Sequence, residues 1–175
     1  MSARSAALRN QLATHHAELQ FALGSLRPEQ MQVAVYAHGT AAEWTVQALL
    51  AHMANAAEGM LQIAQAVARA ENPVPEGWDV DRWNNSQVRK HAAEPAAALI
   101  SRIQNAHAGW MQFVDGVSEV ELQRTGRHPI GRTLSVKQMV QTHALHQVQH
   151  IRELTAALAS SGQRPADLSA SRPAA

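Results

Sequence analysis

Apolar residues recur at spacings of three and four in four long segments, and this period constrains the fold of the 175-residue chain most strongly. Such a period places apolar side chains along one face of an α-helix. The helices expected from it run from about Ala3 to Leu26, from near Thr45 to the prolines after Asn72, from Glu94 to Gly116, and from Val136 to about Ser160. A shorter helix is expected from a cap at Asp79 or Asp81 to about His91.

The segments between these helices carry turn-forming residues. Residues 117–134 hold Gly126, Pro129 and Gly131 and are expected to form a loop, since no persuasive strand alternation is visible. Ser135 is the expected N-cap of the final helix. Four long helices and one short one predict an all-α, up-down four-helix bundle. It is expected to be a single domain over residues 1–161, followed by a disordered tail over 162–175.

Composition narrows the function. The formal net charge is +1, without a basic block, so neither a nucleic-acid nor a membrane surface is expected. Cysteine is absent, which excludes disulfides, thiolate metal ligands and a cysteine nucleophile, so any thiol chemistry needs an external thiol. The first residues lack an apolar signal core, and no apolar run reaches about 18 residues. A cytoplasmic location is therefore predicted.

Three histidines share one stripe of the expected final helix. At about 100° per residue, His143, His146 and His150 fall within about 60° of one another. Apolar residues accompany them on that stripe, so it should face the core, where each unsatisfied imidazole nitrogen would cost about 1–3 kcal/mol. A metal ion is one shared partner for these nitrogens, while nearby glutamines or ordered water are another.

The axial spacing of the histidines defines the candidate ligand pairs. His146 and His150 lie one turn apart, about 6 Å along the axis, and His143 and His146 are similarly close. His143 and His150 are about 10.5 Å apart, so His146 belongs to either pair and the choice of its partner stays open. His52, beside the apolar stripe of the second long helix, is the best candidate for a third ligand. Three imidazoles suit Zn, Ni, Fe or Cu.

The remaining histidines have a simpler interpretation. None of them requires more than solvent or a local hydrogen bond, and this group comprises His15, His16, His38, His91, His107 and His128.

Taken in order, three stretches resemble the DinB-like family of metal-binding four-helix bundles. The first runs from Trp44 to His52 and is followed by the acidic Glu58; the second, Asp79 to Asn84, is similar to the family's Asp-x-Asp-x-x-Asn segment. In the third, residues 131–136 lead into a helix with the family's His-x-x-x-His pattern, His146 to Leu154. The resemblance extends over about Leu8 to Leu158.

The resemblance implies a specific ligand set and a range of activities. By the family pattern the metal ligands are His52, His146 and His150, which leaves His143 one turn away, as a neighbour of the ligands, a pocket residue or a structural residue. Where many members carry a histidine or an acidic residue around the final pair, this chain has glutamines. Relatives include metal-dependent transferases and isomerases that use low-molecular-weight thiols, so a thiol-dependent S-transferase or isomerase acting on a small molecule is expected.

Two other functions are considered beside it. In a metal-dependent hydrolase the nucleophile would be metal-bound water, and Glu58 is the obvious acidic candidate for a base, although its spacing from His52 points it elsewhere on the helix. In a non-enzymatic, stress-related bundle the metal would be structural, or helix faces would form a homodimer. The residues expected around the mouth of the site are Trp44, Trp78, Trp83 and Arg82.

Overall fold

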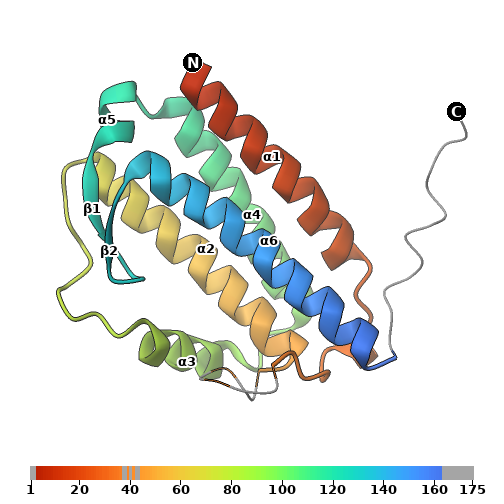
Figure 1. Ribbon diagram of the computed structural model, residues 1–175. Helices are drawn as coiled ribbons and strands as arrows, with labels where there is room; N and C mark the ends of the chain where they lie inside the picture. Colours follow the sequence, from red (N-terminus) through yellow and green to blue (C-terminus); the bar gives the residue numbers. More distant parts are fainter. Residues whose placement is uncertain (1–2, 37–38, 40, 42–43, 163–175) are drawn as a thin grey trace, which may run out of the picture.

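Four long helices form the body of the computed structural model, which describes residues 3–36, 39, 41 and 44–162 (Figure 1). They are α1 (Ala3–Gly24), α2 (Val46–Ala68), α4 (Ala96–Gly116) and α6 (Val136–Ser160). The short helices are the 3-10 turn η1 (Pro28–Gln30), α3 (Val80–His91) and α5 (Glu119–Gln123). The predicted all-α four-helix bundle with an additional short helix is confirmed.

Side-chain caps fix where three of the helices begin. The Thr45 side chain accepts a hydrogen bond from the backbone of α2, and Asp79 accepts one from the backbone of α3. Ser135 caps α6 in the same way, and the side-chain oxygen of Gln138 accepts a hydrogen bond from the backbone N–H of Ser135. These bonds satisfy backbone N–H groups that have no partner within the helix. Asp79, rather than Asp81, is therefore the cap of the short helix.

The helices are connected in an order that differs from the simple up-down alternation predicted from the sequence. In Figure 1, α1 and α6 run in one direction, and α2 and α4 run in the other. Two contacts show the parallel course of α2 and α4: the Gln47 side chain bonds the carbonyl of Glu94, and Trp110 Nε1 donates to the carbonyl of Ala57 at 3.1 Å. Each of α1 and α2 packs against both α4 and α6. The connection from α1 to α2 therefore joins two helices that are not neighbours. The connection from α2 to α4, which contains α3, joins two parallel helices.

The prediction of a loop over residues 117–134 is wrong. This segment holds α5 and most of an antiparallel hairpin of β1 (Thr125–His128) and β2 (Arg132–Ser135). Strands of four residues are too short to display a clear alternation, which is why the pattern missed them. Gly131 has a positive φ of 77° in the turn, and Gly126 packs so closely on α2 that an added Cβ would lie 2.4 Å from a methyl of Val67.

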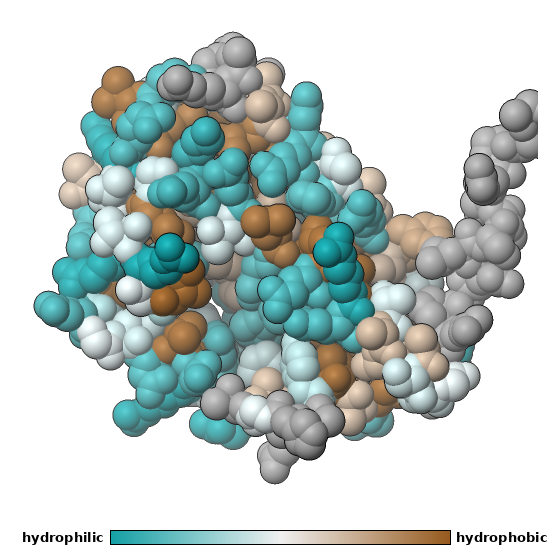
Figure 2. Space-filling model, in the orientation of Figure 1, coloured by the Kyte–Doolittle hydropathy of each residue, from teal (hydrophilic) through white to brown (hydrophobic). Residues whose placement is uncertain are grey.

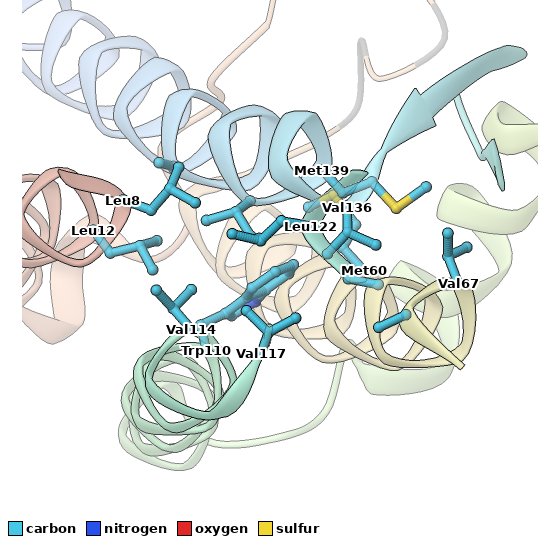
Figure 3. Close-up of a cluster of buried hydrophobic side chains, with 14 of the residues drawn as sticks. Leu8, Leu12, Met60, Val67, Trp110, Val114, Val117, Leu122, Val136 and Met139 are labelled. Atoms are coloured by element: carbon cyan, nitrogen blue, oxygen red, sulfur yellow. The ribbon is translucent and has the colours of Figure 1, made fainter. Parts of the chain in front are cut away.

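Two clusters of buried apolar side chains fill the bundle. One lies at the hairpin end and includes the side chains labelled in Figure 3, with Trp110 among them. The other surrounds the first turns of α2 and the last turns of α6, including Leu49 and Leu154. Within the described ranges, no helix is long and apolar enough to cross a membrane. Apart from Gly162, the tail expected over 162–175 lies outside the described residues.

Candidate metal centre

Three imidazole rings from two neighbouring helices converge on one point. His52 comes from α2, and His146 and His150 come from successive turns of α6. The Nε2 atoms are 3.1 Å apart for His52 and His146, 3.2 Å for His52 and His150, and 3.0 Å for His146 and His150. Among the described residues, this is the group of histidine and acidic side chains with the spacing of a metal site. The structure thus brings together the three residues selected by the family resemblance.

The spacing of these nitrogens fits a single ion. Three nitrogens each about 2.0–2.1 Å from one zinc ion at tetrahedral angles would stand about 3.3–3.4 Å apart, close to the observed triangle. The Nδ1–H of His150 donates to Glu153, which leaves a lone pair on its Nε2. Lone pairs that face one another in a buried place repel unless a proton or a cation lies between them. The donor set is therefore suited to a divalent metal.

Burial keeps these rings in the form that binds metal. Desolvation and, to a smaller extent, the neighbouring His150 lower the pKa of His52 to about 3, while Glu153 opposes the shift. Desolvation also holds the pKa of His146 well below its ordinary value. The pKa of His150 is lowered by burial, and Glu153 opposes that shift. All three imidazoles are neutral at pH 7, and neutral imidazole is the metal ligand.

An acidic residue supports the triad from behind. Glu153 Oε2 lies 2.7 Å from His150 Nδ1 and accepts a hydrogen bond of 2.5 Å from the Tyr36 hydroxyl. Gln149 donates to the other carboxylate oxygen at 2.8 Å. Burial raises the pKa of Glu153, but these hydrogen bonds outweigh it and hold that pKa below its usual range. Although glutamines surround the final histidine pair, an acidic partner is thus supplied from the next turn of α6.

Sequence reasoning missed Tyr36, which lies outside every helix. Its place is set by backbone pairing before α2, where Val35 N–H donates to the carbonyl of Trp44 at 2.9 Å. Burial, reinforced by Glu153, raises the pKa of Tyr36. The Trp44 ring packs on His52 with 4.9 Å between ring centroids, and its Nε1 donates to Asn85. A phenol donor and an indole wall therefore fix one side of the triad.

His143 does not belong to the triad. Its ring is stacked on Trp110, with 4.4 Å between centroids and 10° between planes. It lines a separate small cavity of about 10 Å³ together with His15, His16 and His107. Of the open alternatives for His143, the structure therefore places it in the core, away from the three converging nitrogens.

The triad lies in the wall of a cavity of about 570 Å³. Figure 2 shows the molecular surface hollowed between the hairpin and α3 on one side and the helices of the bundle on the other. Trp44, Trp78 and Trp83 line this cavity, as expected from the sequence. Arg82 does not: it is exposed and absent from the lining, because its position on α3 turns it outward.

His128 is a second residue that the sequence did not single out. It was expected to be an ordinary solvated or locally bonded histidine, yet it is 3% exposed and lines the cavity. Its Nδ1 accepts from the Ile130 N–H at 3.3 Å, while its buried Nε2 has no hydrogen-bond partner among the described residues. Only the hairpin turn, which the sequence pattern did not reveal, brings this ring to the cavity.

Glu58 bonds to a neighbouring helix and points away from the triad, as its spacing from His52 indicated. Its two carboxylate oxygens accept hydrogen bonds from Arg102 of α4 at 2.9 and 2.7 Å. Arg102 also contacts Glu94 and Asn55, so it links α2 to α4. Glu58 is a structural residue and does not line the cavity.

The bundle and its histidine triad define a four-helix-bundle protein with a candidate metal centre, and comparison with known proteins identifies the family. The profile of the DinB superfamily matches residues 11–154, and the chain belongs to this family.

Two individual relatives are similar to this chain in sequence. Both carry the name "putative metal-dependent hydrolase". The one from Oceanobacillus iheyensis is 23% identical over 112 residues, covering 64% of this chain and 63% of its own length. The one from Halalkalibacterium halodurans is 22% identical over 116 residues, covering 66% of each chain. The matches thus span slightly less than two thirds of these relatives.

A solved structure shares the fold. YfiT from Bacillus subtilis, described as "a probable metal-dependent hydrolase with an unusual four-helix bundle topology", superposes with a TM-score of 0.74 at 17% sequence identity. The superposition covers 93% of this chain and 90% of YfiT. The likeness extends over nearly the whole of both chains.

Proposed function

We propose that the protein is a metal-dependent hydrolase whose ion is held by His52, His146 and His150. The observation that carries the proposal is the convergence of three neutral imidazoles in the wall of a cavity large enough for a small molecule. The names of the two relatives support the same class of reaction. When bound, a divalent ion with an open position supplies an acidified water and polarises a carbonyl group.

The surrounding residues position these ligands. Glu153 accepts the Nδ1–H of His150 and so fixes which nitrogen faces the ion. Tyr36 donates to Glu153 and thereby holds the carboxylate in place. Trp44 packs on the His52 ring and excludes water from that side. Each residue lies in or beside the cavity, which is therefore preorganised before a substrate enters.

The thiol S-transferase predicted from the resemblance is an alternative that uses the same site. The names of the relatives give it no support. Hydrolysis needs water alone, whereas S-transfer needs an external thiol because the chain has no cysteine. An assay with and without an added thiol therefore distinguishes the two reactions.

The test is an assay of zinc-, nickel- and iron-loaded protein against esters and amides, with and without chelator and with and without a low-molecular-weight thiol. We expect turnover that needs the metal and no thiol. Turnover that appears only with thiol would replace hydrolysis by S-transfer. Turnover that survives full removal of the metal would overturn both.

A pair of variants separates the site from the fold. His146→Ala removes the central ligand, and we expect it to lose metal and turnover together. His91→Ala changes a histidine that pairs with Glu94 outside the cavity, and we expect it to keep both. Circular dichroism of the metal-free proteins shows whether both variants fold.

A further inference from the structure

The walls of the large cavity are mostly apolar. Helix α2 contributes Met60 and Ile63, and the chain between α2 and α3 contributes Val74 and Pro75. Pro129, in the hairpin turn, also lines the cavity. Water gains little from contact with such walls, so a ligand with an apolar body is favoured by their burial.

Two large apolar side chains at this cavity are exposed to solvent. Trp78 is 37% exposed and Ile130 is 50% exposed, and both line the cavity. They come from different elements, the loop before α3 and the turn of the hairpin. An exposed tryptophan and isoleucine beside one cavity leave apolar surface for a ligand to cover.

A pair of indole rings forms part of the wall. The ring centroids of Trp78 and Trp83 are 6.2 Å apart, and the planes are inclined by 50°. Gly59 of α2 faces Trp83, where an added Cβ would lie 3.6 Å from the indole edge. Two inclined indoles offer π faces and edges to a flat ring, and such contacts add to the burial of apolar area.

The charges around the cavity have one sign. None of the described residues that line it is lysine or arginine, whereas Asp81 and Glu153 are both carboxylates. Asp81 is exposed, and the Glu153 carboxylate accepts hydrogen bonds from Tyr36 and Gln149. A ligand anion would enter without a partner and would be repelled, while a neutral or cationic ligand would not.

We propose that this cavity selects uncharged or cationic ligands that have a flat apolar body, which Trp78 and Trp83 hold. The inference deepens the proposed function, since it names the substrate class of the same site and rests on that proposal for the chemistry. The bound metal attracts anions and Glu153 lies directly behind its ligand His150, so the selection against anions depends on Asp81 and on the indole pair.

The test measures binding, which is independent of turnover. Zinc-loaded protein is titrated with three naphthalene probes: the neutral N-(2-naphthyl)acetamide, the cationic 2-naphthylmethylammonium and the anionic 2-naphthalenesulfonate. Calorimetry gives each dissociation constant. We expect the first two to bind at least about tenfold more tightly than the sulfonate. A sulfonate that binds as tightly as the neutral probe would overturn the proposal.

Variants show which side chains carry the selection. Trp83→Ala is expected to weaken the neutral probe by about tenfold, because it removes one indole. Phe21→Ala is the matched control: Phe21 is an aromatic residue on α1, 51% exposed and outside the cavity lining, so binding should not change. If wild type and Trp83→Ala bind the neutral probe equally tightly, the indole pair does not contribute to ligand binding.

A charge variant completes the design. Ile130→Lys places a cation at the cavity and removes apolar surface, so it should raise the affinity for the sulfonate relative to that for the neutral probe. No such relative gain for the sulfonate would contradict the role assigned to charge. If the probes bind in the expected order but no ester or amide is hydrolysed, the proposed reaction fails and the ligand selectivity stands. Turnover together with the opposite binding order would support the reaction and overturn the selectivity.

Discussion

Replacing Glu153 by glutamine tests how far the support of His150 determines metal affinity. The substitution keeps the shape of the side chain but removes the charge that accepts hydrogen bonds from His150 at 2.7 Å and from Tyr36 at 2.5 Å. Loss of such an outer partner of a metal ligand lowers metal affinity by about 10–100-fold. That range corresponds to about 1.4–2.7 kcal/mol of binding free energy.

The assay is competition for zinc between the protein and a chromophoric chelator at pH 7. Gln149→Ala is the control, since it removes only the contact to the other carboxylate oxygen of Glu153. We expect a change of less than about threefold for the control, because a surface hydrogen bond contributes about 0.5 kcal/mol. An unchanged zinc dissociation constant for Glu153→Gln would refute the reasoning that the carboxylate orients His150.

Three other perturbations have definite outcomes. Gly126→Ala places a Cβ 2.4 Å from Val67, so it should lower the free energy of unfolding by about 1–3 kcal/mol. Gly116→Ala should not, because beyond its own chain neighbours and helix backbone no described atom lies within 4 Å of the added Cβ; equal urea midpoints would contradict this. Burial lowers the pKa of His143 to about 3 in the folded protein, so its contribution to stability is complete above the unfolded pKa, about 6.5, and falls by about 1.4 kcal/mol per pH unit as the pH drops from there toward 3. Unfolding of His143→Phe in urea at pH 7 and pH 5 should therefore show a smaller acid loss than the wild type, and an equal loss would exclude this histidine as its source. Zinc at a hundredfold excess over its dissociation constant should raise the unfolding free energy by about 2.7 kcal/mol, and a thermal midpoint that ignores zinc would count against binding to the folded state.

The sequence predicted those parts of the fold that depend on local patterns. The helical period, the cap at Ser135 and the choice between Asp79 and Asp81 as the other cap are local, and they placed the helices close to their observed ends. The hairpin was missed because its strands are four residues long, and their pairing depends on contacts with α2 that no short pattern records. The parallel course of α2 and α4 likewise follows from packing between distant segments.

The residues of the candidate site likewise divide into those with a local signal in the sequence and those without one. His143, His146 and His150 share one helix, so their spacing alone made them candidates, with His146 common to either pair. The position of His52 beside an apolar stripe made it the candidate third ligand, and the family resemblance selected His150 over His143. Tyr36 and His128 lie in segments without helical period and reach the site through backbone pairing and the hairpin turn. Glu153 was visible in the sequence, but its role required knowing that its carboxylate reaches His150 Nδ1.

The central claim is that the three converging imidazoles hold one metal ion. Anomalous X-ray diffraction from crystals of the zinc-loaded protein at the zinc edge tests it most directly. We predict one strong peak within about 2.0–2.1 Å of Nε2 of His52, His146 and His150. No peak among these rings, or a peak beside His143 in their place, would contradict it.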